Sequence, residues 1–230
     1  MIQQAVHGNY GFYHLLSGQD FLLRPIQEIQ TFFDANAGKE FLAVDNWPLS
    51  REAMIDRIDQ YHFMSKNRHI TMAMNRFTSP LQHLLGIHLA KRKDVECFAK
   101  GMNWASMTHA FVSCLLNEEE RIMKIAQHAL CFDEIYKQMV FNEHKGEFEL
   151  YQEIKSPNET KGIPRYSLEV LSTMHKVDWA RGTPYVYRSS DFNELIHSPC
   201  MFARKFNSDV DKEIIDHLFE YVMQEKNQGN

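Results

Sequence analysis

Apolar residues near the start of the chain form two short runs with a helix-like pattern between them. Residues 12–16 predict a buried strand, and residues 17–20 (SGQD) predict the turn that follows it. A helix is expected from Arg24-Pro25 to about Ala35, because apolar residues recur at helical spacing before Gly38. Residues 41–44 predict another strand. This order of strand, turn, helix and strand is typical of an α/β sheet with crossover helices.

The rest of the chain continues the mixed pattern. Further strands are expected at 70–74, 102–107 and 175–179, and the basic segment 86–100 predicts a solvated loop or helix end. Helices are expected after a cap at Thr108 or Ser106, from Glu118, from Cys131 to about Phe141, and from Asp209 to Gln224. Asp191 and Glu194 have the spacing of a capping box, and residues 142–167 predict an exposed excursion.

Composition excludes several classes of protein. The chain has 230 residues, 44% of them apolar, so it can bury a globular core. A net charge of -5 argues against a general nucleic-acid binder, and no run approaches the roughly 20 apolar residues of a membrane span. Four widely spaced cysteines predict reduced thiols in a cytoplasmic protein.

No metal site is expected from the residue spacing. The histidines are scattered without an HExxH or a His/Cys pair at ligand spacing. One Asp-x-Asp string, Asp209-Val210-Asp211, opens the last amphipathic helix. Acids at that position are typical helix caps, so capping is favoured over metal binding.

Several strings together resemble one family. FYHLLSGQDFLLRPIQEIQTFF, GKEF, NWASMTHAFVSCLL, FDE, VDWARGTPY and MFARKF occur in this order, and an acidic helix is expected after the last of them, so that together they extend from about residue 10 to 222. They resemble the core-2/I-branching β-1,6-N-acetylglucosaminyltransferases, in particular bacterial members, to which peptide O-xylosyltransferases are similar. The sequence departs from the family at Leu22, where a proline is usual.

The resemblance implies an α/β, GT-A-like fold and an inverting transfer of N-acetylglucosamine, or xylose, from a UDP-sugar to a glycan hydroxyl. It implies a mechanism without a metal ion or any other cofactor. The enzyme is expected in the cytoplasm or at the periphery of the inner membrane, and a homo-oligomer is an open alternative. Family members have a strand–helix–strand unit upstream of the first motif. The chain is therefore expected to be one incomplete domain (1–230), with 1–45 the remainder of the nucleotide-binding half and 46–230 the acceptor and catalytic part. An inactive remnant that serves as a binding module is the alternative function.

The resemblance assigns the catalytic base to Glu134. An inverting transfer needs one carboxylate near the acceptor hydroxyl. Asp133 and Glu134 also suit the first turn of the expected helix, so a purely structural role is the alternative.

Fixed cations replace a metal in the mechanism that the resemblance implies. Lys205 and Arg188 match the family's basic positions and would bind the donor diphosphate. Arg204 is the alternative to Lys205, and an ordinary surface pair is the alternative for both.

The remaining candidates would contact the donor or the acceptor. Ser17, Gly18 and Asp20 follow a predicted strand, where open α/β sheets bind ligands, although a structural turn is an equal alternative. Trp104 and Trp179 are candidate platforms for a sugar ring, with burial in the core as the alternative.

Overall fold

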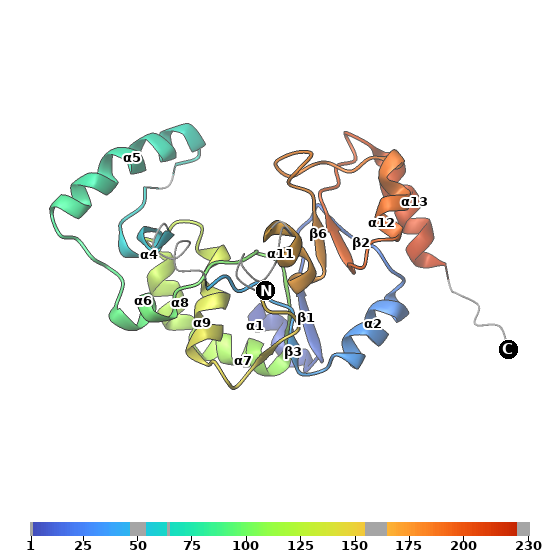
Figure 1. Ribbon diagram of the computed structural model, residues 1–230, viewed down its shortest axis with the longest axis horizontal. Coiled ribbons are helices and arrows are strands. Elements are labelled where there is room, and N and C mark those ends of the chain that lie inside the picture. Colours follow the sequence, from blue (N-terminus) through green and yellow to red (C-terminus); the bar gives the residue numbers. More distant parts are fainter. Residues whose placement is uncertain (1, 47–53, 64, 155–164, 225–230) are drawn as a thin grey trace. The chain divides into compact units, whose positions relative to one another are not determined.

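The computed structural model describes residues 2–46, 54–63, 65–154 and 165–224. Contacts divide the chain into two compact units (Figure 1). Unit 1 comprises residues 1–43, 104–109 and 149–230, and unit 2 comprises residues 44–103 and 110–148. Each unit is therefore built from segments that are far apart in the sequence.

The first part of unit 1 is held by short strand pairs. Strand β1 (Phe12–Leu15) pairs in antiparallel fashion with β4 (Ala105–Thr108), and β3 (Lys39–Glu40) runs parallel to β5 (Glu149–Leu150). Phe41 forms a single bridge to Ser106. The strand expected at 41–44 is therefore shifted toward the N-terminus. Residues 42–44 are buried, but they lie outside the described ladders.

The second part of unit 1 is a mixed sheet. Among the described residues, it contains β2 (Asp20–Leu22), β7 (Phe202–Arg204) and β6 (His175–Val177), in that order. Strands β2 and β7 are antiparallel, whereas β6 and β7 are parallel. Asp20, Arg204 and Val177 lie in one row across the three strands, at the carboxyl ends of β6 and β7.

Two apolar clusters support this sheet. Phe33, Phe41 and Phe202 belong to one cluster, to which helix α2 (Ile26–Ala35) contributes as its apolar spacing predicted. Leu23, Leu195 and Leu218 belong to the other, which includes residues of α12 (Phe192–Ile196) and α13 (Lys212–Met223). In the described part of unit 1, the other helical segments are α1 (Ile2–Ala5), η1 (Val6–Gly8), α11 (Arg165–Thr173) and η3 (Ser189–Asp191).

Unit 2 is helical apart from isolated bridges in its described residues. Its core contains Ile58, Phe98, Phe132 and Ile135. Its described elements are α4 (Asp56–Asp59), α5 (Arg68–Leu84), α6 (Arg92–Cys97), α7 (His109–Asn117, whose first residue belongs to unit 1), α8 (Glu119–Ala126), η2 (Phe132–Glu134) and α9 (Tyr136–Glu143).

The predicted strand at 70–74 is wrong, because these residues lie within α5. The side chain of Asn67 caps this helix by accepting a hydrogen bond of 2.9 Å from the backbone N–H of His69. The apolar residues recur at helical spacing across the whole of 70–84, a period that a five-residue window does not reveal. The chain is thus a mixed α/β protein with small sheets, and none of its described helices is long and apolar enough to cross a membrane.

Candidate functional site

The carboxyl ends of β6 and β7 bring several sequence-predicted residues together. Val177 and Arg204 end the two parallel strands, and Asp20 begins the neighbouring β2. The turn before β2 is attached at the same edge, since the backbone N–H of Phe206 donates to the carbonyl of Gln19 over 2.9 Å. This edge is where α/β sheets place their ligands. It is the candidate site of unit 1.

The side chain of Asp20 is almost completely buried at this edge. Only 1% of it is exposed, and both of its oxygens accept hydrogen bonds within unit 1. The Ser17 hydroxyl donates to Oδ1 over 2.8 Å, and Nε1 of Trp104 donates to Oδ2 over 3.0 Å. The guanidinium of Arg204 lies 3.2 Å from Oδ1. These bonds favour the structural reading of Asp20 over direct contact with a ligand hydroxyl.

Arg204 is committed to the same cluster. Besides Asp20, its guanidinium bonds to the Ser17 hydroxyl and lies 5.4 Å from the centre of the Trp104 ring. A cation held in this way by a buried carboxylate already has its counter-charge. Arg204 is therefore a poor candidate for the diphosphate, and Lys205 remains the better one.

Trp104 is half-buried and stacks on His175, with ring centres 5.0 Å apart. Burial lowers the pKa of His175 well below its usual value, although the nearby Asp20 carboxylate opposes the shift. His175 is thus neutral at physiological pH, and its Nε2 lies 3.8 Å from Asp20 Oδ2. These contacts favour a packing role for Trp104, which was the alternative to a sugar platform.

Ser17, Gly18 and Trp179 lie at the surface. A Cβ atom added at Gly18 would meet nothing within 4 Å, so the fold does not require glycine there. Trp179 follows β6, and 41% of its surface is exposed. Of the two predicted tryptophans, Trp179 is the one whose ring is open to a ligand.

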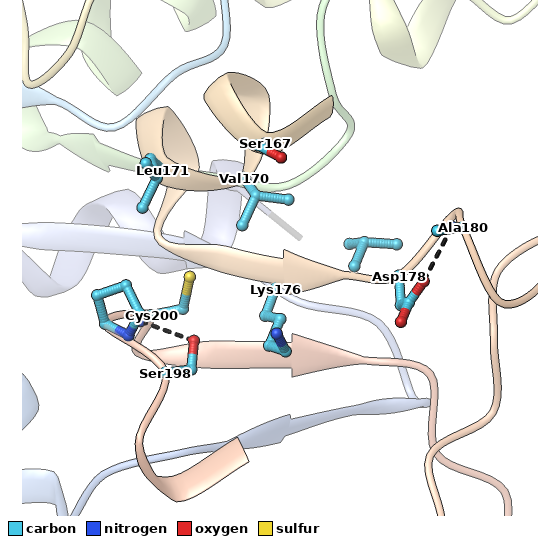
Figure 2. A pocket seen from close by; sticks show the side chains of 10 residues that line it. Ser167, Val170, Leu171, Lys176, Asp178, Ala180, Ser198 and Cys200 are labelled. Atoms are coloured by element: carbon cyan, nitrogen blue, oxygen red, sulfur yellow. Dashed lines mark hydrogen bonds between the residues drawn. The ribbon is translucent and has the colours of Figure 1, made fainter. Parts of the chain in front are cut away.

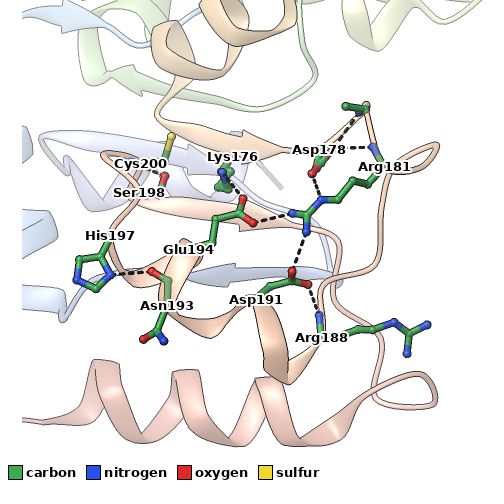
Figure 3. Close-up of polar contacts among 11 residues, drawn as sticks. Lys176, Asp178, Arg181, Arg188, Asp191, Asn193, Glu194, His197, Ser198 and Cys200 are labelled. Atoms are coloured by element: carbon green, nitrogen blue, oxygen red, sulfur yellow. Dashed lines mark hydrogen bonds and ion pairs between the residues drawn. The ribbon is translucent and has the colours of Figure 1, made fainter.

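Lys205 and Arg188 are brought together by the backbone. The N–H of Tyr187 donates to the carbonyl of Lys205 over 2.9 Å, and Arg188 follows directly. Arg188 is exposed and Lys205 is partly exposed. Among the described residues, neither side chain has an acidic partner within ion-pair distance. Figure 3 shows the Arg188 side chain pointing away from the polar cluster around Arg181. Lys205 and Arg188 therefore lie on two segments that the hydrogen bond between Tyr187 and Lys205 holds together.

Arg181 organises the loop after β6, a role that the sequence analysis missed. Its guanidinium binds Asp178 over 2.5 Å, Asp191 over 2.7 Å and Glu194 over 2.9 Å (Figure 3). Burial alone would raise the pKa of Asp178, but hydrogen bonds from Arg181 hold it below its ordinary value. The Asp178–Arg181 spacing of three residues was the available signal.

The capping box expected at Asp191 and Glu194 is wrong. The Asp191 carboxylate accepts a hydrogen bond of 2.9 Å from the backbone N–H of Arg188, and its other oxygen binds Arg181. Glu194 binds Arg181 and, over 2.9 Å, the ammonium of Lys176. Neither carboxylate therefore caps the first turn of α12, because Asp191 bonds to Arg181 and to the preceding backbone, and Glu194 bonds to Arg181 and Lys176.

A pocket of about 320 Å³ lies between α11 and the end of β6 (Figure 2). Val170 and Leu171 of α11 line one side, and Lys176 and Cys200 line another. Burial raises the pKa of the Cys200 thiol, so it remains protonated. The charged groups of the pocket are already paired, since Lys176 binds Glu194 and Asp178 binds Arg181. These pairs leave the pocket without a free charge to bind an anion.

Glu134 belongs to unit 2 and ends the 3₁₀ turn η2. Helix α9 begins only at Tyr136, so Glu134 precedes the helix that it was expected to start. Its Oε2 accepts a hydrogen bond of 2.9 Å from Arg57 and lies 3.8 Å from Lys100. The side chain is 30% exposed, and no donor to Oε1 is found in the part of the chain that the structure describes. One carboxylate oxygen is thus anchored and the other is left for a ligand.

Lys137 lies one turn beyond Glu134 and is buried. Its ammonium donates to the backbone carbonyl of Asp133 over 2.6 Å and lies 4.5 Å from the centre of the Tyr136 ring. Desolvation lowers the pKa of Lys137 to about 8, against the attraction of Asp133 and Glu134. No pattern in the sequence indicates this buried cation.

Asp211 caps α13, as its position in the Asp-x-Asp string predicted. Its carboxylate accepts hydrogen bonds from the backbone N–H groups of Ile214, over 3.1 Å, and Ser189, over 2.8 Å. In unit 2, ligand atoms of Glu118, Glu143 and His144 lie within 4.8 Å of one another. Arg121 binds both of these glutamates, so a protein cation already occupies the space between the acids.

Comparison with known proteins adds no identification. The chain matches no protein-family model and no curated protein.

Proposed function

We propose that the chain is a metal-independent, inverting glycosyltransferase of GT-A-like fold that uses a UDP-sugar. The observation that carries the proposal is the pairing of two basic residues at the carboxyl edge of the β2–β7–β6 sheet. The hydrogen bond between Tyr187 and Lys205 holds Arg188 and Lys205 on adjacent segments. Neither side chain has an acidic partner among the described residues, whereas Arg204 forms an ion pair with Asp20.

Two such cations suit a diphosphate. Charge-assisted bonds to phosphate oxygens are short and strong, and fixed cations can stabilise a developing charge as a metal ion does. The donor would be UDP-N-acetylglucosamine or UDP-xylose, a choice that rests on the resemblance. The exposed ring of Trp179 is the platform that we assign to a sugar face.

Glu134 is the proposed base. Its Oε1 takes the proton of the acceptor hydroxyl while that oxygen attacks the anomeric carbon of the donor. The bond to the diphosphate oxygen breaks with its electrons, and Lys205 and Arg188 stabilise the departing UDP. Arg57, bound to Oε2 over 2.9 Å, fixes the orientation of the carboxylate.

Donor hydrolysis tests the base without requiring the acceptor. UDP release from UDP-N-acetylglucosamine and from UDP-xylose is measured with water as the acceptor, in wild type, Glu134→Gln and Asp133→Asn. We expect Glu134→Gln to lose about 100-fold or more in rate, since general-base catalysis supplies factors of that order. UDP binding by this variant should be unchanged. The exposed Asp133 is the matched control and should retain activity.

Two results would contradict the proposal in different ways. Retained hydrolysis in Glu134→Gln would remove this residue as the base. A wild-type chain that binds UDP but turns over neither donor would favour the alternative of an inactive binding module.

A further inference from the structure

Helix α5 (Arg68–Leu84) presents its apolar side to solvent. Its large apolar residues recur at intervals of four and three, the spacing of one helical stripe. All are exposed, including Phe77 at 81% and Leu84 at 83%: the stripe consists of Ile70, Met74, Phe77, Leu81 and Leu84. Soluble helices usually bury such a stripe against a core, so the arrangement requires a reason.

Polar side chains attach α5 to the rest of unit 2. Asn75 bonds to both backbone groups of Phe63, over 2.9 and 3.3 Å, and Gln82 bonds to both of Tyr61, over 2.8 and 3.1 Å. Thr71 bonds in the same way to Ser65. Figure 1 shows α5 standing apart from α6, α8 and α9. The helix is thus held by its polar side, which leaves the apolar stripe without a described partner.

The sequence segment that contains this helix carries basic residues and no acids, although the Asp56 carboxylate from outside the segment lies 2.9 Å from Nε2 of His83 on α5. The chain carries a net charge of -5, yet residues 60–93 contain no aspartate or glutamate. The same segment contains six basic residues, Lys66, Arg68, Arg76, Lys91, Arg92 and Lys93. Arg92 and Lys93 are paired with Glu96 and Glu143, so the cations on or beside α5 that remain for a ligand are Lys66, Arg68 and Arg76. A ligand of this surface should therefore offer hydrocarbon that covers the apolar stripe. It should also carry negative charge that pairs with the cations beside the stripe.

We propose that α5 binds the surface of an anionic lipid bilayer, lying in the interface with its apolar stripe inserted. Amphipathic helices with basic polar residues and exposed Phe and Leu bind in this way. A second copy of the chain fits less well, because pairing two α5 stripes would bring their cations together with no acid in the segment to neutralise them. The proposal is independent of the glycosyltransferase assignment.

Co-sedimentation of the full chain with vesicles tests the proposal. Vesicles of phosphatidylcholine are compared with an equimolar mixture of phosphatidylcholine and phosphatidylglycerol. We expect binding to the anionic vesicles, weakened by added salt because salt screens exposed charges. Phe77→Glu and, independently, Leu84→Glu should each lower the partition coefficient about tenfold or more. Arg76→Gln should lower it about fivefold on anionic vesicles only.

Matched controls lie outside the helix. Phe219 is an exposed phenylalanine on α13, and Phe219→Glu should bind vesicles like wild type. Lys212→Gln is the corresponding control for charge. Equal losses in Phe77→Glu and Phe219→Glu, or no binding to anionic vesicles, would overturn the proposal. So would a wild-type dimer in light scattering that Phe77→Glu dissociates, since the stripe would then be an interface between copies.

Discussion

The carboxylate of Asp20 and the guanidinium of Arg204 lie 3.2 Å apart, on directly paired residues of β2 and β7. The carboxylate is 1% exposed and the guanidinium side chain 20%, so water screens the pair only weakly. The turn at residues 17–20 is thereby attached to the strand that leads into Lys205. The turn at residues 17–20, which resembles a ligand-binding motif, thus holds β2 and β7 together.

Replacing Asp20 should therefore destabilise the chain. In Asp20→Asn, the charge of Arg204 would remain in place without its counter-charge, and we expect a loss of about 3 kcal/mol in unfolding free energy. Urea unfolding measures this loss. The exposed Asp209→Asn is the control and should change little. A stable Asp20→Asn variant with weakened UDP binding would instead make Asp20 a ligand contact.

Glu40 predicts a pH dependence of stability. It is fully buried, and desolvation raises its pKa to about 7 from 4.5, against hydrogen bonds from Thr108. Because the pKa of Glu40 is higher in the folded than in the unfolded chain, the protonated carboxyl stabilises the fold. This contribution is complete below pH 4.5 and is lost as the pH rises through 7. The loss is about 3 kcal/mol. Glu40→Gln should lack this dependence, which the difference between the two stability–pH curves measures. Parallel curves would contradict the assignment.

Lys137 predicts the opposite trend at higher pH. Its pKa falls from 10.5 to about 8 in the folded chain, so the folded state disfavours the charged form. Stability should rise by up to about 3 kcal/mol as the pH increases from 8 to 10.5, because the unfolded chain still holds the proton over that range. Lys137→Met should not show this rise in matched unfolding curves. An unchanged rise in the variant would assign the effect to other groups.

The sequence predicted those parts of the fold that local patterns determine. Strand β1 and helix α2 lie where apolar spacing placed them, and Asp211 caps α13 as its string indicated. The resemblance also selected Lys205 and Arg188, which the structure brings to adjacent segments.

Long-range pairing accounts for the features that sequence patterns did not reveal. The spacing of Asp191 predicted a cap on the helix after it, but one carboxylate oxygen binds Arg181, ten residues earlier, and the other accepts from the backbone N–H of Arg188. Lys137 belongs to a run of five consecutive buried residues, 137–141, in α9, a burial on all sides of the helix that no apolar stripe in the sequence indicates. Residues 70–74 alone predict a strand, whereas the longer stripe that continues to Leu84 has the helical period of α5.

The central claim is that Lys205 and Arg188 bind a diphosphate without a metal ion, and calorimetric titration of UDP tests it directly. The titrations compare wild type, Lys205→Ala, Arg188→Ala and the surface control Lys212→Ala, each with and without EDTA. We predict that EDTA leaves binding unchanged and that each of the first two variants binds UDP about tenfold or more weakly, as the loss of one charge-assisted bond requires. Unchanged affinity in Lys205→Ala, or binding abolished by EDTA, would contradict the account.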